Sequence, residues 1–184
     1  IYLGNSVTLI NGVGGIGHET ARLLTEFGVK VIGIDPRPEY QVEGMEIYPP
    51  GKLKELLPKA DFVITTVPHT PVTEFTFKAE TFELMKNTAY FINIGRGMVC
   101  KIDDLADAIE SGEIAGCGLD VYEVEPLPAD HKLWGLDNVL MTPHVAIVDA
   151  ENIPERRFEI LLDNAKSFLS GENLKNVVDK ETWY

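Results

Sequence analysis

The sequence predicts an α/β fold in which a doubly wound parallel sheet of about seven strands lies between helices, in three layers. Short apolar runs alternate with helix-patterned segments along most of the chain. A glycine-rich turn, GVGGIG at residues 12–17, joins the first apolar run to the first helical pattern. The run 61–67, DFVITTV, is almost wholly apolar, which is typical of a central strand that is buried on both faces of a parallel sheet.

The elements follow in order. Residues 16–27 have apolar positions near a period of 3.6 and end at Gly28, which predicts a helix, and Pro36 and Pro38 stop the strand that follows it. The predicted strands are 7–11, 30–35, 45–48, 61–67, 89–94, 114–122 and 138–142. The predicted helices are 16–27, 53–57, 79–85, 102–112 and 152–171.

The proline-rich segment 123–137, EVEPLPADHKLWGLD, is predicted to be a loop, and a loop this long in a compact domain usually serves function or extends from a sheet edge. No repeat, low-complexity segment or linker stands out in the 184 residues. We therefore expect one domain.

Composition limits the partners and the compartment. The formal charge is -13, from 29 acidic and 16 basic residues, which disfavours nucleic acid and anionic membranes. No apolar run approaches the roughly 18–20 residues of a membrane span, and residues 1–10 do not resemble a signal peptide, so we expect a cytoplasmic protein. Cys100 and Cys117 lack metal-ligand spacing and are expected to be small core residues, and no metal site is predicted.

The glycine-rich turn predicts a dinucleotide site. Gly12 permits the tight turn, Gly14 lets the backbone approach a pyrophosphate, and Gly17 lets the helix pack closely on the sheet. A merely flexible loop would show the same spacing, but the strand before it and the helix after it favour the site. Asp35 ends the second strand 18 residues after Gly17, where a carboxylate can accept hydrogen bonds from ribose hydroxyls.

Asp35 also bears on the choice of cofactor. Its charge repels a 2′-phosphate, which favours NAD over NADP. Arg37, two positions later, keeps NADP open, and a simple turn residue before Pro36 is the alternative for Asp35.

Three polar residues, Arg96, Glu125 and His144, each follow a predicted strand. A guanidinium can clamp a carboxylate through two hydrogen bonds, and an imidazole beside a carboxylate can transfer protons. Each has a plain alternative: an exposed turn arginine, a solvated glutamate with Glu123 as its competitor, and a structural histidine. Because parallel strands end at one edge of the sheet, where ligands bind, the three together favour catalysis.

At these residues the sequence resembles the NAD-binding domain of the D-isomer-specific 2-hydroxyacid dehydrogenase family. The resemblance runs over nearly the whole chain and rests on the strings GVGGIG, ADFVITTVPHTPVT, MKNTAYFINIGRGMV, LADAIESGEIAGCGLDVYEVEPLPADHKLW and NVLMTPHVA. Within the family, EPLPADHKLW followed by TPHVA is most similar to the glyoxylate and hydroxypyruvate reductase branch. Phosphoglycerate and lactate are further candidate substrates.

The resemblance implies an oxidoreductase that interconverts a 2-oxo acid and a D-2-hydroxy acid with NAD. Arg96 would hold the substrate carboxylate and polarise its carbonyl, His144 would be the acid and base, and Glu125 would bond His144 and favour the imidazolium. The implied cofactor contacts are Gly15 and Ile16 at the pyrophosphate, Asp35 at the ribose, Val67 and Pro68 beside the adenosine with Thr73 nearby, and Ile94, Gly95, Arg96, Asp120 and His144 around the nicotinamide.

The sequence departs from the family pattern at four positions. Asn11 stands where an apolar residue is usual, and Gly15 replaces an arginine or lysine, which removes one phosphate contact. His69 stands in place of a frequent leucine, and Ile147 stands in place of a small residue. His69 either touches substrate or cofactor or has no role in binding.

The family also has a substrate-facing domain of roughly a hundred residues, the size of a small domain, which we do not find in this sequence. We expect this chain to be the NAD-binding half, to dimerise through this domain, and to turn over substrate poorly by itself. Trp183, Tyr184 and part of the last helix, which in the family reach toward that domain, are expected to be underburied. The alternatives are an NAD(H)-sensing partner protein, like the co-repressors of this family, and an unrelated NAD enzyme of the same Rossmann-type fold.

Overall fold

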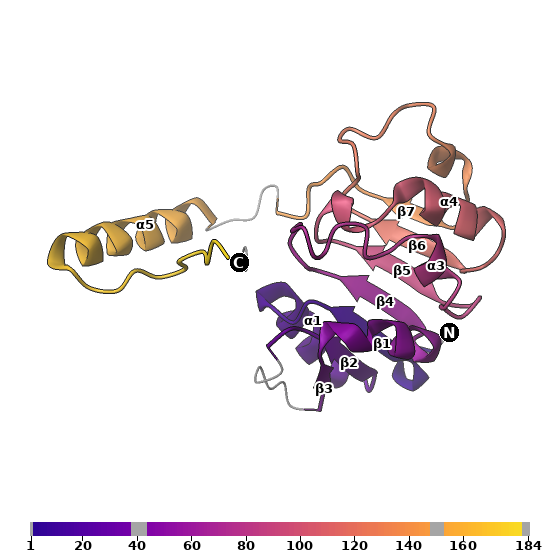
Figure 1. Ribbon diagram of the computed structural model, residues 1–184, viewed down its shortest axis with the longest axis horizontal. Coiled ribbons are helices and arrows are strands. Elements are labelled where there is room, and N and C mark those ends of the chain that lie inside the picture. Colours follow the sequence, from indigo (N-terminus) through magenta and orange to yellow (C-terminus); the bar gives the residue numbers. More distant parts are fainter. Residues whose placement is uncertain (1, 38–43, 148–152, 182–184) are drawn as a thin grey trace. The chain divides into compact units, whose positions relative to one another are not determined.

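The computed structural model describes residues 2–37, 44–147 and 153–181 (Figure 1). The chain divides into two compact units, Ile1–His144 and Val145–Tyr184, at a point where the sequence shows no linker. The predicted single domain stays a prediction.

The first unit contains a sheet of seven parallel strands in the order β3-β2-β1-β4-β5-β6-β7. This confirms the predicted doubly wound sheet. Successive strands are added toward one side of the sheet from β1 to β3 and toward the other side from β4 to β7. The neighbours β1 and β4 therefore form the switch point at which such sheets bind ligands. The strands are β1 Val7–Asn11, β2 Lys30–Ile34, β3 Glu46–Tyr48, β4 Phe62–Thr65, β5 Tyr90–Asn93, β6 Gly116–Leu119 and β7 Val139–Met141.

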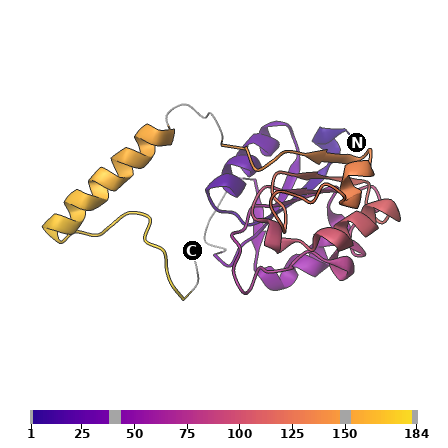
Figure 2. The ribbon, with the colours of Figure 1, turned by 90° about the horizontal axis from the view of Figure 1, so that it is seen from above.

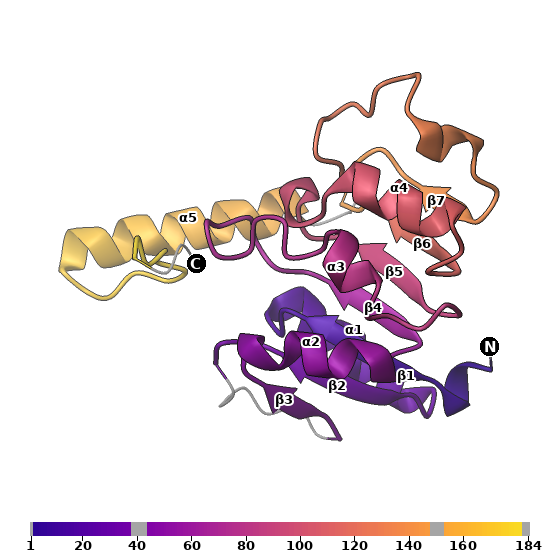
Figure 3. The same cartoon turned by 45° about the vertical axis from the view of Figure 1, so that its right-hand side comes forward.

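Helices cover both faces of the sheet. Successive strand residues point to opposite faces, so Leu9 joins the larger core cluster, under α2, α3 and α4, while Ile10 joins the smaller one, under α1 (Figure 3). The helices are α1 Gly15–Glu26, α2 Leu53–Leu56, α3 Ala79–Phe82 and α4 Ile102–Glu110. Short 3-10 helices occupy Leu3–Asn5, Pro50–Lys52, Leu57–Lys59, Gly97–Val99 and Lys132–Gly135.

Several elements are shorter than predicted. The strand predicted at 61–67 ends at Thr65, the strand at 114–122 covers Gly116–Leu119, and the helix at 79–85 ends at Phe82. Apolarity does not stop where the hydrogen-bond ladder stops, because Val121 and Tyr122 stay buried in the loop after β6. The segment predicted as a plain loop, 123–137, contains a 3-10 helix.

Both cysteines lie in the core and are unpaired, as predicted. Burial raises the pKa of the Cys117 thiol to about 12 and raises that of Cys100 as well, so neither thiol ionises near neutral pH. Among the described helices, none has both the length and the apolar composition that crossing a membrane requires.

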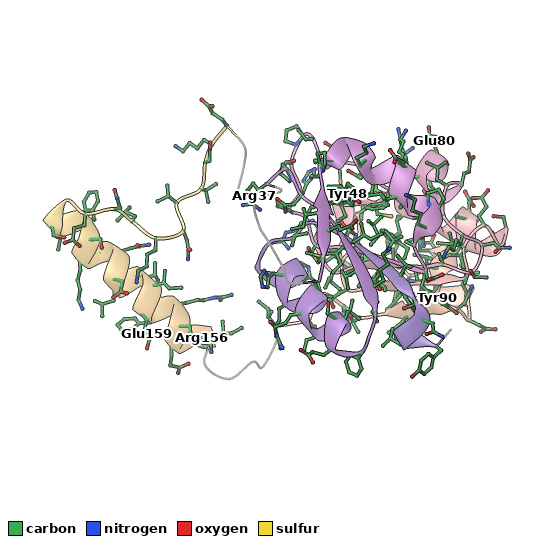
Figure 4. All side chains as sticks on the ribbon, turned by 90° about the horizontal axis from the view of Figure 1, so that it is seen from below. Arg37, Tyr48, Glu80, Tyr90, Arg156 and Glu159 are labelled. Carbon is green, nitrogen blue, oxygen red and sulfur yellow. The ribbon has the colours of Figure 1, made fainter. Side chains whose placement is uncertain are left out.

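The second unit consists of α5, Ile153–Ser170, and a tail that turns back along it (Figures 1 and 2). Asn164 exchanges two hydrogen bonds with the backbone of Lys175, whose ammonium lies 2.7 Å from Asp163. No described residue of α5 is buried, which confirms the predicted underburial of this helix, whereas Trp183, Tyr184 and the predicted first residue, Asn152, lie outside the described residues. Arg156 and Glu159 project from α5 in Figure 4.

Candidate active site

The glycine-rich loop lies where β1 ends, beside the start of α1. Gly12 has a φ of 98°, a conformation that L side chains rarely adopt, and its carbonyl accepts a hydrogen bond of 2.6 Å from the Thr66 hydroxyl. A Cβ on Gly17 would lie 2.0 Å from the Gly12 carbonyl oxygen. The close packing of α1 on the loop therefore requires glycine at position 17.

The amino end of α1 has the features of an anion site. Gly14 is the N-cap residue and no side chain caps the helix. A Cβ added at Gly14 or Gly15 would meet nothing within 4 Å, so the space in front of these backbone groups is open. Uncapped amides and the positive end of the helix dipole favour a phosphate there. These residues fit a dinucleotide pyrophosphate.

Asp35 follows β2 directly and its side chain is 3% exposed. One carboxylate oxygen accepts the Val13 N–H at 2.8 Å, and the other accepts the backbone N–H and the Nε–H of Arg37, both at 3.0 Å. Asp35 therefore fixes the glycine-rich loop to the end of β2 and holds Arg37 beside it. Figure 4 labels Arg37 and Tyr48, the last residue of β3. The contact of Asp35 with a ribose stays a prediction.

The segment after β4 lies between the glycine-rich loop and the loop after β5. A Cβ on Gly12 would lie 2.8 Å from a Val67 methyl group, and one on Gly95 would lie 2.7 Å from the Val67 carbonyl. The Thr73 hydroxyl donates to the Pro68 carbonyl at 2.7 Å and so closes the turn. Val67, Pro68 and Thr73 thus hold the predicted cofactor side of the site in shape.

His69 lies on the same turn and is exposed. Its Nε2 lies 3.6 Å from a carboxylate oxygen of Glu74. The two alternatives for His69, a place near substrate or cofactor and no role in binding, both stay predictions.

The Arg96 loop is held by its neighbours rather than by the arginine. Asn93, fully buried at the end of β5, accepts the Gly95 N–H at 3.1 Å and donates to the Arg96 carbonyl at 3.1 Å. A Cβ on Gly97 would lie 1.8 Å from the Tyr122 carbonyl oxygen, so this loop packs directly on the segment after β6. Arg96 itself is exposed, and its Nη1 donates to the Gly95 carbonyl at 2.7 Å. Ile94 is half-buried just before it.

The ends of β6 and β7 are tied together. The Thr142 hydroxyl donates to the Asp120 carboxylate at 2.6 Å, and the Tyr122 hydroxyl donates to the Thr142 carbonyl at 2.9 Å. These bonds fix the segment that leads from Thr142 to His144.

His144 and Glu125 are brought together, with Nδ1 of the imidazole 2.8 Å from Oε2 of the carboxylate. The other Glu125 oxygen accepts the Tyr122 N–H at 3.0 Å. Glu123 points elsewhere and accepts the Ile102 N–H at 3.2 Å, so the structure makes Glu125 and not Glu123 the partner of the histidine. His144 has a φ of 55°, an uncommon conformation that is found preferentially at functional sites.

This pairing sets the charge and the tautomer. Burial by itself raises the pKa of Glu125, but the hydrogen bonds from His144 and the Tyr122 N–H outweigh it and lower the pKa. Glu125 is therefore a carboxylate near neutral pH. An ionised carboxylate only accepts, so Nδ1 of His144 carries a proton and Nε2 is left to exchange one with a ligand.

The segments that carry the three predicted catalytic residues are linked by contacts. The Arg96 loop packs on Tyr122 through Gly97, Tyr122 bonds Glu125, and Glu125 bonds His144. A cavity of about 370 Å³ adjoins the pair and is lined by Tyr122, Glu125, Pro126, Leu127, Trp134, Met141, Thr142, Pro143 and His144. Among the described residues, no group of three or more His, Cys, Asp or Glu side chains could hold a metal ion.

Two residues that build this site, Asn93 and Tyr122, were not predicted from the sequence. Asn93 was visible as the one polar residue of the run YFIN, directly before the Gly95 turn. The role of Tyr122 had no sequence signal, because its bonds to Thr142 and Glu125 join segments whose spacing only the fold sets.

Comparison with known proteins agrees with this architecture. Residues 2–146 match the family model of the D-isomer specific 2-hydroxyacid dehydrogenase NAD binding domain. A glyoxylate reductase of Thermofilum pendens is 38% identical over 182 residues, which are 97% of this chain and 52% of that protein. The human glyoxylate reductase/hydroxypyruvate reductase is 42% identical over 146 residues, which are 78% of this chain and 44% of that protein.

Solved structures agree as well. A D-isomer specific 2-hydroxyacid dehydrogenase of Xanthobacter autotrophicus, in complex with NADPH, superposes with a TM-score of 0.92 at 32% identity and covers 100% of this chain and 75% of its own. An NADPH-dependent glyoxylate/hydroxypyruvate reductase of Sinorhizobium meliloti, in complex with NADP and sulfate, superposes with a TM-score of 0.91 at 34% identity. The match covers 100% of this chain and 58% of that one. The chain spans about half the length of the curated relatives that it matches. With its seven-stranded sheet, its open helix terminus and this match, the chain belongs to the D-isomer-specific 2-hydroxyacid dehydrogenase family, within its NAD-binding domain.

Proposed function

We propose that this chain is the NAD-binding half of an oxidoreductase that interconverts a 2-oxo acid and a D-2-hydroxy acid, with glyoxylate or hydroxypyruvate as substrate. The observation that carries the proposal is the 2.8 Å contact of His144 with Glu125 at the carboxyl edge of the sheet. The substrate-binding domain would lie in another part of the protein, and residues 1–184 would form the cofactor domain with its C-terminal helix and tail. The names of the relatives favour catalysis over NAD(H) sensing.

The cofactor would lie across the switch point of the sheet. The first-turn amides of α1, with Gly12, Gly14, Gly15, Ile16 and Gly17, would hold the pyrophosphate, and Asp35 would bond the ribose. The adenosine and nicotinamide contacts would be Val67, Pro68, Thr73, Ile94, Gly95, Arg96, Asp120 and His144. The nicotinamide supplies the hydride, and the protein supplies binding and orientation.

The polar residues would divide the remaining work. The Arg96 guanidinium would bind the substrate carboxylate through parallel hydrogen bonds. In reduction, Nε2 of His144 gives its proton to the carbonyl oxygen, and in oxidation it takes the proton back. Glu125 stays ionised and holds Nδ1–H of His144, which leaves Nε2 to exchange the proton with the substrate.

Turnover of glyoxylate and hydroxypyruvate with NADH by the whole protein tests this function. We expect His144→Gln to lower kcat by about 10²- to 10⁴-fold, the range of general acid–base catalysis, with NADH binding retained. Glu125→Gln should lower kcat as well, whereas the matched variant Glu123→Gln should keep most of it. An unchanged kcat in His144→Gln would indicate different chemistry, and tight NADH binding without any turnover by the wild type would favour sensing.

For the choice of cofactor, we propose that NAD is preferred over NADP because Asp35 carries a negative charge at the ribose position. Arg37 is paired with this carboxylate, so its guanidinium is less available to bind a 2′-phosphate. We expect Asp35→Ala to weaken NADH binding. Parallel titrations should show a smaller ratio of the dissociation constant for NADPH to that for NADH. An unchanged ratio of the two dissociation constants would remove Asp35 from this role.

Two further proposals concern assembly and location. We propose a homodimer formed through this domain, since the edge strand β7 leaves Leu140 72% exposed. Sedimentation should give twice the monomer mass, and a monomer at micromolar concentration would contradict it.

We also propose a cytoplasmic location, which the two unpaired cysteines support, and fractionation of the tagged protein tests it.

A further inference from the structure

The segment 123–137, called here the Glu125 segment, carries a half-buried imidazole that the proposed reaction does not use. The His131 side chain is 11% exposed, and its Nδ1 accepts the Leu133 N–H at 3.2 Å, which caps the 3-10 helix Lys132–Gly135. Nε2 must then carry the proton of the neutral ring. Within the described part of the chain this buried nitrogen finds no hydrogen-bond partner.

The unpartnered nitrogen faces a carboxylate. Nε2 of His131 lies 3.4 Å from Oδ1 of Asp103 in the first turn of α4, which is ion-pair distance for a protonated ring, although hydrogen-bond geometry is not met. The next residue, Lys132, pairs its ammonium with Asp107, one turn further along α4. Two consecutive residues of the Glu125 segment therefore lie beside two carboxylates on one face of α4.

A third contact ties the beginning of the same segment to the same helix. Glu123 accepts the N–H of Ile102, the first residue of α4. Leu133 is fully buried in the core, and the Trp134 indole donates to the Pro128 carbonyl at 2.9 Å. The Glu125 segment is thus fastened on both sides of Glu125.

Helix α4 also follows the Arg96 loop directly, because only Lys101 separates its first residue from the end of that loop at Cys100. The remaining first-turn carboxylate, Asp104, is engaged by the Ala79 N–H at 2.9 Å and so ties α4 to α3. The two segments that carry Arg96 and Glu125 therefore share one support.

We propose that α4 positions the Glu125–His144 pair: Asp103 and Asp107 hold His131 and Lys132, and thereby keep Glu125 where it bonds His144. Asp103, Asp107, His131 and Lys132 are positioning residues and touch neither substrate nor cofactor. The inference rests on the proposed function of Glu125 and His144.

The test compares two double variants of the full chain with the same change in charge. Asp103→Asn/Asp107→Asn removes both contacts, whereas Glu110→Gln/Glu113→Gln removes two exposed carboxylates near the end of the same helix. The readout is the carboxyl ¹³C resonance of Glu125 followed against pH. In the wild type its pKa should lie below the ordinary glutamate range, because the bonds from His144 and Tyr122 outweigh burial.

We expect the pKa of Glu125 to rise in Asp103→Asn/Asp107→Asn toward its value in His144→Gln, and to stay unchanged in Glu110→Gln/Glu113→Gln. A loss of global stability alone would not change the titration of Glu125 in the folded protein. Asn at position 131 keeps an acceptor for the Leu133 N–H but cannot reach Asp103, so His131→Asn should raise the pKa of Glu125 while the 3-10 helix persists.

The outcomes separate this inference from the proposed function. An ordinary pKa for Glu125 in the wild type would show that the Glu125–His144 pair is absent, which would overturn both. A low pKa that is unchanged in Asp103→Asn/Asp107→Asn would overturn only the role of α4. In the whole protein, Asp103→Asn/Asp107→Asn should lower kcat by about tenfold with KM for NADH unchanged, since supporting contacts of this kind act through the residue that they orient.

Discussion

At the scale of single residues, the candidate site depends on glycines that let backbones meet. Gly17 brings α1 against the Gly12 carbonyl, and Gly97 brings the Arg96 loop against the Tyr122 carbonyl. Both replacements of hydrogen by a methyl group would place carbon within 2.0 Å of backbone oxygen. The sequence indicated the first of these contacts through the GxGxxG spacing, but it gave no reason for the second.

We expect Gly17→Ala to lower the free energy of unfolding by about 3 kcal/mol, because neither backbone can yield without moving α1. The matched change Gly15→Ala should leave stability nearly unchanged, since an added Cβ there meets nothing within 4 Å. Urea unfolding of both variants measures the difference. Equal stabilities would contradict the close packing.

The candidate catalytic residues could be named from the sequence because each is a chemically distinctive residue at the end of an apolar run. Most of their supports could not be. Tyr122 and Thr142 bond partners that lie 20 and 22 residues away, and residue type alone does not reveal such bonds. Asn93 was visible only as a polar residue before the Gly95 turn. The choice of Glu125 over Glu123 likewise became visible only in the fold.

At the scale of elements, all seven strands and the five main helices were predictable, because parallel strands covered on both faces are continuous apolar runs. Their ends were less predictable. Val121 and Tyr122 continue the apolar run of β6 but serve the loop, and the 3-10 helix Lys132–Gly135 depends on the His131 cap and on the burial of Leu133.

Asp61 directly precedes β4 and offers a test of how the elements are joined at the amino ends of the strands. The hydrogen bond from Lys86, helped by that from the Val7 N–H, outweighs burial and lowers the pKa of Asp61. A carboxylate whose pKa is lower in the folded state stabilises the fold above the ordinary Asp range, near pH 4, and loses that effect as the pH falls through the folded-state value.

We therefore expect Asp61→Asn to lower the free energy of unfolding by about 1–2 kcal/mol at pH 7 and by progressively less below about pH 4. The exposed Lys52–Glu55 pair provides the control, because Glu55→Gln should leave stability unchanged at every pH. Chemical unfolding across pH measures both. A deficit in Asp61→Asn that does not depend on pH would contradict the charge-based account.

At the scale of the whole molecule, the residues proposed for the cofactor and for catalysis all lie in the first unit. The second unit is an amphipathic helix with a tail pinned to it, and it contributes none of them. The division at residues 144 and 145 falls in a segment without any linker composition, so the sequence carries no signal for it.

A chain that ends at Ile147 should accordingly bind NADH with a dissociation constant within about twofold of that of the full chain, a change of less than about half a kcal/mol. Fluorescence titration of both forms measures this. A tenfold loss of affinity in a truncated chain that remains folded would show that residues 148–184 take part in the cofactor site.

The central claim is that the carboxyl edge of the sheet holds the dinucleotide with one end at the amino terminus of α1 and the other beside Arg96 and His144. Titration of the ¹⁵N-labelled chain with NADH, followed by amide chemical shifts, tests it most directly. We expect saturable shifts at Gly14–Gly17, at Ile94–Arg96 and at His144 in the same titration. Shifts that are missing from the start of α1, or that leave Arg96 and His144 unchanged, would contradict it.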